Sequence, residues 1–136
     1  MHAEPPRVRV LIVDDHVDSA ESLAELMQLC GYETRLAHDG WQAVHQARAW
    51  QPQALLLDIN LPGLDGQEVA RRIRRTEWGA SALLIALSGW GAVDDREQSL
   101  AAGFNHHLVK PVDLHALEAL LATAFAPHDP PAAAAA

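Results

Sequence analysis

Lysine and cysteine are almost missing from this chain of 136 residues, since each occurs only once, as Lys110 and Cys30. A single cysteine excludes an intramolecular disulfide bond. Positive charge is scarce, with 10 Lys and Arg against 18 Asp and Glu, and the net charge is −8. This balance argues against nucleic acid as a direct partner, because phosphate binding needs a basic face. The longest apolar runs have about six residues, against the roughly 20 that a membrane-spanning helix needs, so we expect no membrane insertion.

The N-terminus also lacks the basic-then-apolar layout of a secretory signal, and we therefore expect a cytoplasmic protein. The chain is 49% hydrophobic and 21% charged, which is typical of a soluble globular protein. Its length suits one domain with a core of its own. We expect a short lead-in over residues 1–7, a folded domain over 8–126, and a Pro- and Ala-rich tail or linker stub over 127–136.

Hydrophobic periodicity predicts five strands that alternate with five helices. The expected strands are 8–13, 33–37, 54–58, 82–87 and 105–109, and the expected helices are 17–30, 41–50, 66–75, 93–102 and 114–125. This alternation predicts a three-layer, doubly wound α/β fold of the flavodoxin-like (βα)5 type, with a parallel sheet between two layers of helices. The arginines at 71, 72, 74 and 75 are expected to form a solvated face of the third helix.

Polar side chains stand at the carboxyl ends of four of the apolar runs. They are Asp14 and Asp15, Asp58, Ser88 and Lys110. A single aspartate in such a place is more often a turn or cap residue, but core packing alone does not require four polar ends. Ligands of doubly wound sheets bind outside the carboxyl ends of the strands. We therefore expect these five residues to converge on one site.

The chemistry of this set points to phosphoryl transfer. Three carboxylates held together repel one another and need a cation or a proton. Oxygen ligands favour Mg²⁺, or Mn²⁺ in its place. Asp58 could then act as a nucleophile that forms an aspartyl-phosphate. Mg²⁺ and Lys110 would supply positive charge, and Ser88 could offer its hydroxyl to a phosphoryl oxygen.

The chain resembles the receiver domain of two-component response regulators over residues 7–126. The matching motifs are LIVDD at 11–15, LLDINLPGLDG at 56–66, ALSG at 86–89 and VKP at 109–111. The resemblance implies strand order 2-1-3-4-5. It also implies that Asp58 accepts a phosphoryl group from a histidine of a sensor histidine kinase or histidine phosphotransfer protein. The domain would then signal to a partner through the face of its fourth helix, fifth strand and fifth helix, acting as a switch rather than an enzyme.

Further residue roles come from the same resemblance. Asp14, Asp15 and Asp58 would hold Mg²⁺ together with the backbone carbonyl of Asn60. Ser88 would bind the phosphoryl group, and Lys110 would pair with it. The family has a cis peptide before the proline that follows its lysine, here Pro111, and only X-Pro bonds adopt cis at low cost.

Two positions depart from the commonest family pattern. His107 stands where the switch residue is usually Tyr or Phe, and we expect phosphorylation to draw Ser88 toward the phosphoryl group while His107 moves inward. Trp90, at the rim, is bulkier than the residue of many members, and we expect it to shield the aspartyl-phosphate from water. The stretch 103–108 is similar to receivers of hybrid histidine kinases, whereas the chain as a whole also resembles single-domain CheY-like regulators.

Three other functions fit the sequence less well. A phosphorylation-independent receiver-like adaptor would not need all five site residues. A phosphatase or phosphomutase with an aspartyl nucleophile needs a second acid just beyond it, where this chain has Asn60. A flavin carrier of the flavodoxin type needs a phosphate-cradling loop after the first strand, and Asp14 and Asp15 there would repel phosphate. Whether the chain acts alone or is cut from a hybrid kinase stays open.

Overall fold

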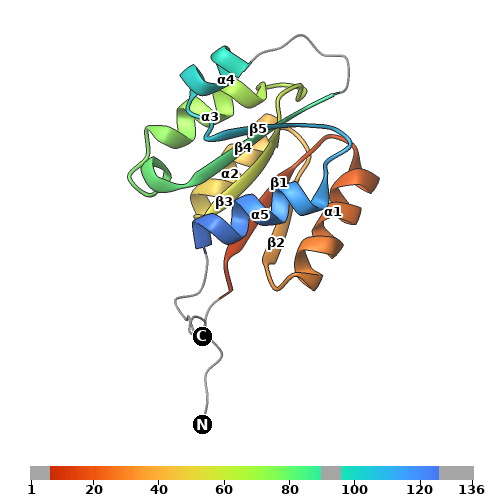
Figure 1. The fold of residues 1–136 in the computed structure, drawn as a ribbon. Coiled ribbons are helices and arrows are strands. Elements are labelled where there is room, and N and C mark those ends of the chain that lie inside the picture. The colour runs from red at the N-terminus through yellow and green to blue at the C-terminus, as the bar shows by residue number, and fades with distance from the viewer. Residues whose placement is uncertain (1–6, 90–95, 126–136) are drawn as a thin grey trace.

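The structure is a computed structural model that describes residues 7–89 and 96–125 (Figure 1). Five parallel strands form one sheet in the order β2-β1-β3-β4-β5. The elements along the chain are β1 (Arg9–Val13), α1 (Val17–Leu29), β2 (Glu33–Ala37), α2 (Gly40–Trp50), β3 (Ala54–Asp58), α3 (Gly66–Arg74), the 3-10 helix η1 (Trp78–Ser81), β4 (Leu83–Ser88), α4 (Arg96–Ala102), β5 (His106–Val109) and α5 (Leu114–Phe125). The expected three-layer α/β fold with strand order 2-1-3-4-5 is confirmed.

The core forms two layers, one on each face of the sheet. Helices α1 and α5 pack on one face, and α2, α3 and α4 cover the other (Figure 1). Along β1, Val10 and Ile12 belong to the first layer and Leu11 to the second, because successive strand side chains point to opposite faces. Strand β3 is buried along its whole length, as a central parallel strand should be.

The strand order fixes where a site can form. From β1 the chain moves outward to β2, and then crosses to β3, β4 and β5 on the other side. The order therefore reverses between β1 and β3, and a doubly wound sheet opens its crevice at the carboxyl ends of those two strands. The residues that follow β1 and β3 lie at this edge.

Some local expectations need adjustment. Ser88 is the last residue of β4 rather than the first residue after it, and η1 was not expected from the sequence. The fourth helix is described only from Arg96. The expected lead-in, apart from Arg7, and the expected tail lie outside the described residues, so the domain limits stay a prediction. Within the described ranges, no helix is long and apolar enough to cross a membrane.

Arg74 does not belong to a solvated face, contrary to the expectation for the third helix. Its guanidinium donates to the carbonyl oxygens of Gly79 (2.8 Å), Ala82 (2.6 Å) and Gly103 (2.8 Å), and to Oδ1 of Asn105 (2.8 Å). Burial lowers the pKa of Arg74. The side chain thus ties the η1 segment to the turn that leads into β5.

We expect an Arg74→Met variant to lose about 2 kcal/mol of unfolding free energy, because hydrogen bonds from a charged donor are each worth about 1.5–3 kcal/mol and methionine keeps only the packing. Urea-induced unfolding measures this loss. The control is Arg71→Met, whose side chain pairs with Glu68 on the same helix (2.9 Å) and should lose less than about 0.5 kcal/mol. Equal losses in the two variants would contradict a special role for Arg74.

Candidate functional site

Polar side chains from four strands meet at the carboxyl edge of the sheet. Asp14 follows β1, Asp58 and Ser88 end β3 and β4, and Lys110 follows β5. Asp14, Asp58 and Ser88 are only 4–5% exposed, whereas Asp15 turns to the surface. The structure therefore brings the predicted residues to one edge, with Asp14 and Asp58 as its buried carboxylates.

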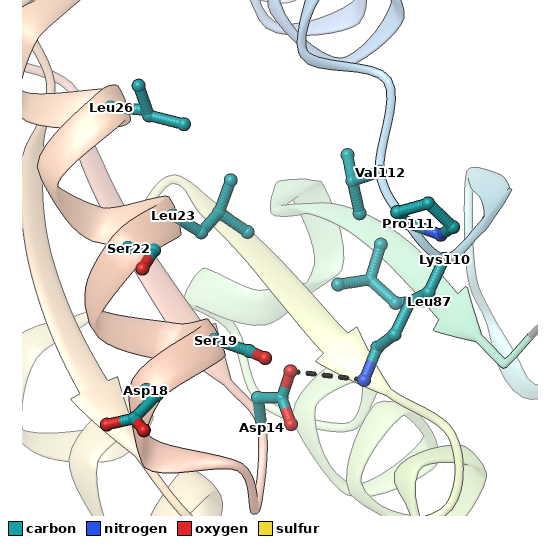
Figure 2. A pocket seen from close by; sticks show the side chains of 10 residues that line it. All are labelled: Asp14, Asp18, Ser19, Ser22, Leu23, Leu26, Leu87, Lys110, Pro111 and Val112. Atoms are coloured by element: carbon teal, nitrogen blue, oxygen red, sulfur yellow. Dashed lines mark hydrogen bonds and ion pairs between the residues drawn. The ribbon is translucent and has the colours of Figure 1, made fainter.

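Lys110 joins the two buried carboxylates. Its Nζ lies 2.7 Å from Oδ2 of Asp58 and 3.1 Å from Oδ2 of Asp14, and Figure 2 shows it reaching Asp14 from the opposite wall of a groove. Burial alone would lower the pKa of Lys110, but hydrogen bonds and charge attraction from Asp58 and Asp14 raise it above its usual range. The Lys110–Pro111 peptide bond is cis, as expected.

Backbone turns fix the other oxygen of each carboxylate. Oδ1 of Asp14 accepts from the backbone N–H of His16 (2.9 Å), and Oδ1 of Asp58 accepts from the backbone N–H of Asn60 (3.0 Å). Such contacts between an aspartate and the N–H two residues later are Asx turns. They orient both carboxylates before any ligand binds.

The two aspartates that follow β1, Asp14 and Asp15, suit a hard divalent cation. Carboxylate oxygens of Asp14 and Asp15 lie close enough to act on one ion, and oxygen donors are those that Mg²⁺ prefers. The sequence had not singled out His16, but its Nδ1 lies 3.5 Å from Oδ1 of Asp14 and 3.4 Å from Oδ1 of Asp15. The position of His16 directly after two aspartates was the sequence signal that could have placed it at the site. The role expected for the Asn60 carbonyl stays a prediction.

The two expected switch residues are in direct contact. Oγ of Ser88 and Nε2 of His107 are 2.7 Å apart. Since Nε2 contacts Ser88 of β4 and the other ring nitrogen, Nδ1, is buried as well, the imidazole lies inward against β4 in this structure. Their action as a switch stays a prediction, and Trp90 lies outside the described residues.

A groove of about 590 Å³ opens beside the buried carboxylates (Figure 2). Asp14 and Lys110 line its polar end. Leu23 and Leu26 of α1 face Val112 across its apolar part. The groove therefore runs from Asp14 and Lys110 along the surface of α1.

A doubly wound sheet with two buried carboxylates, one lysine and one serine at its carboxyl edge is typical of an α/β phosphoacceptor domain. A family model described as the response regulator receiver domain matches residues 10–122. The chain belongs to this family, and its function is that of a phosphoacceptor receiver domain in two-component signalling.

Similar proteins agree with this family. Response regulator MprA of Mycobacterium bovis is 41% identical over 115 residues, which cover 85% of this chain and 48% of that protein. The chain thus spans about half the length of the curated relatives it matches. The solved receiver domain of sensor histidine kinase PA1611 from Pseudomonas aeruginosa is 34% identical, has a TM-score of 0.79, and is matched over 87% of this chain and 97% of that one. That structure contains a magnesium ion coordinated in its active-site cleft.

A third neighbour was solved with a partner. The receiver domain of Ssk1 from Saccharomyces cerevisiae, in complex with the histidine phosphotransfer protein Ypd1, is 28% identical and has a TM-score of 0.77. The match covers 91% of this chain and 96% of that chain. Receivers of both sensor kinases and response regulators are thus similar to this chain.

Proposed function

We propose that Asp58 accepts a phosphoryl group from the phosphohistidine of a sensor histidine kinase or histidine phosphotransfer protein, with Mg²⁺ held by Asp14, Asp15 and Asp58 and by the backbone carbonyl of Asn60. The observation that carries this proposal is the environment of Asp58. Its carboxylate is buried, one oxygen is fixed by a backbone N–H, and the other faces the amine of Lys110 at 2.7 Å. This is a nucleophile held in place beside a fixed positive charge.

The chain's own groups can carry the steps of the transfer. An oxygen of Asp58 attacks phosphorus, the phosphorus–nitrogen bond of the donor breaks, and the donor imidazole leaves with the bonding electron pair. Lys110 would pair with a phosphoryl oxygen, and Ser88 would donate its hydroxyl proton to another. When bound, Mg²⁺ would supply further positive charge to the phosphoryl oxygens. The domain assists its own phosphorylation in this way and acts as a switch rather than a turnover enzyme.

The donor would dock along α1. Leu26 is 41% exposed at the apolar part of the groove, and Leu23 and Val112 line the same part. A donor helix with an apolar face could cover these residues and bring its phosphohistidine to the polar end, beside Asp14 and Lys110. The Ypd1–Ssk1 complex supports this class of partner.

The domain would signal to its downstream partner through the surface formed by α4, β5 and α5, called the α4-β5-α5 face. Leu100 on α4 and Val109 on β5 are 62% and 45% exposed, so this face offers apolar contacts to a downstream protein. We propose no direct contact with nucleic acid, given the net charge of −8.

Incubation with acetyl phosphate and MgCl₂, followed by intact-protein mass spectrometry, tests the proposed function. We expect one phosphoryl group per chain, and none when EDTA replaces the metal. Incorporation that does not depend on a divalent cation would contradict the metal's role. If neither acetyl phosphate nor a phosphohistidine donor labels the protein, the phosphorylation-independent adaptor becomes the better interpretation.

A Lys110→Met variant should separate two effects of the lysine. We expect phosphoryl transfer from acetyl phosphate to slow by about 10²-fold, as when one donor to a developing negative charge is removed. Mg²⁺ should bind several-fold more tightly, because the amine no longer competes for Asp14 and Asp58. Metal titration measures the Mg²⁺ affinity, and the rate of labelling by acetyl phosphate measures phosphoryl transfer. A variant that has lost both Mg²⁺ binding and phosphoryl transfer would indicate that Lys110 supports the site only structurally.

A further inference from the structure

Asp14, the first aspartate after β1, has both of its backbone groups held by the end of β2 and the residue that follows it. The N–H of Asp14 donates to the carbonyl oxygen of Ala37, the last residue of β2, at 3.0 Å. The carbonyl oxygen of Asp14 lies 2.9 Å from Nδ1 of His38, the next residue along the chain. The turn between β2 and α2 is therefore joined to the backbone of the acidic loop after β1 at two points.

His38 is itself fixed by the first turn of α2. Its backbone N–H donates to Oε1 of Gln42 at 2.9 Å, and the backbone N–H of Gln42 donates to Oδ1 of Asp39 at 2.8 Å. This reciprocal pair resembles a capping box in which the glutamine reaches the residue before the N-cap. The half-buried His38 thus starts from an ordered helix end, and its ring is aimed at Asp14.

The contact between His38 and Asp14 fixes where the ring carries a proton. A carbonyl oxygen only accepts hydrogen bonds, so Nδ1 of His38 must carry a proton and donate it to Asp14. In the neutral ring, this requires the Nδ1–H tautomer and leaves Nε2 as an acceptor. In the charged ring both nitrogens carry protons, so the hydrogen bond is present in either charge state.

The carbonyl of Asp14 and the N–H of Asp15 belong to one planar peptide group. A bond that holds this carbonyl therefore also fixes the plane from which Asp15 starts. The buried carboxylate of Asp14 has contacts of its own with His16 and Lys110, whereas Asp15 turns to the surface and depends more on the direction of its backbone.

We infer that His38 is a positioning residue of the Mg²⁺ site, which orients the peptide between Asp14 and Asp15 so that the Asp15 carboxylate faces the ion. The inference rests on the proposed function, in which both aspartates hold the metal. Residues that hydrogen-bond to the groups around a metal orient its ligands without touching the ion, and their loss typically weakens metal binding about 10- to 100-fold.

A His38→Ala variant of the whole chain tests this role through metal binding. We expect the dissociation constant for Mg²⁺ to rise about tenfold, as followed by the shifts of backbone amide NMR signals during titration with MgCl₂. Labelling by acetyl phosphate should be slower than in the parent at low Mg²⁺. At saturating Mg²⁺ the rate should return to within about twofold of the parent, because Asp58 and Lys110 are unchanged.

His38→Asn is the rescue variant, because an asparagine amide can donate to the same carbonyl from about the position of Nδ1. It should bind Mg²⁺ more tightly than His38→Ala does. The matched control is His45→Ala on the exposed side of α2, which should bind Mg²⁺ like the parent. Parental Mg²⁺ affinity in His38→Ala, or equally weak affinity in the Ala and Asn variants, would overturn the inference. A parent that neither binds Mg²⁺ nor is labelled would instead refute the proposed function.

Ring ¹⁵N NMR of the parent tests the hydrogen bond itself and does not depend on the folding of any variant. The spectrum is recorded in mildly alkaline buffer, and His38→Asn assigns the His38 signals by their loss. We expect the neutral ring of His38 to carry its proton on Nδ1. A neutral ring with its proton on Nε2 could not donate to the Asp14 carbonyl, and this result would overturn the inference.

Discussion

An Asp58→Asn variant is expected to take up no phosphoryl group from acetyl phosphate, while its fold stays that of the parent. An amide cannot form the acyl phosphate, and loss of a nucleophile lowers group-transfer rates by at least about 10³-fold. Asparagine keeps an Oδ1 that can accept from the N–H of Asn60, as Asp58 does at 3.0 Å. It also removes one of two buried carboxylates that repel each other. Intact-protein mass spectrometry measures the label, and circular dichroism the fold.

Asp65→Asn is the matched control for this variant. Asp65 is exposed and caps α3, accepting from the N–H of Glu68 at 2.9 Å. Asparagine caps a helix about as well as aspartate, so this variant should be labelled like the parent. Labelling of Asp58→Asn at the parental level would mean that another residue is the acceptor. Loss of label in both variants would mean that the change at 58 is not specific.

A Gly66→Ala variant is expected to lose about 3 kcal/mol of unfolding free energy, at the upper end of what overpacking usually costs. A Cβ at this position would overlap the carbonyl oxygen of Asp58 and would lie 2.8 Å from Cα of Ile59. Both are backbone atoms, and the N–H of Gly66 donates to the carbonyl of Ile59 at 2.9 Å, so neither side can yield easily. The first turn of α3 would be pushed away from Asp58 at the end of β3 and from Ile59 after it.

Urea-induced unfolding measures this loss, and Gly89→Ala is its control. Among residues 7–89 and 96–125, a Cβ at Gly89 meets no atom within 4 Å, and this variant should change stability by less than about 0.5 kcal/mol. We also expect Gly66→Ala to slow phosphorylation, because the backbone of Asp58 must shift. Parental stability of Gly66→Ala would show that the loop and α3 do not approach as closely as the structure describes.

The order of the elements and the main site residues were accessible from the sequence for a physical reason. Buried parallel strands are short apolar runs, and a doubly wound sheet collects whatever follows them at one edge. The positions of Asp14, Asp58 and Lys110 are therefore encoded locally, each next to its own strand. No long-range contact has to be known to place them together.

The contacts of Arg74 and His107 could not be predicted in this way. Arg74 binds mainly backbone carbonyls, which have no sequence signature, and Gly103 is 29 positions away. The contact between Ser88 and His107 depends on the register of β4 and β5, which pairs Ala86 with His107 and Ser88 with Val109. This register puts Ser88 and His107 on the same face of the sheet, two residues apart along the strands. Hydrophobic periodicity predicts strands but does not fix their register.

Locating the phosphoryl group tests the central claim most directly. Borohydride reduces an acyl phosphate to an alcohol, so a phosphorylated aspartate becomes homoserine and can be found by peptide mass spectrometry. After treatment with acetyl phosphate and Mg²⁺, we expect homoserine at position 58 and at no other aspartate. Homoserine at Asp14 or Asp15, or a phosphoryl group that remains on a histidine such as His16, would contradict the assignment of Asp58 as the acceptor.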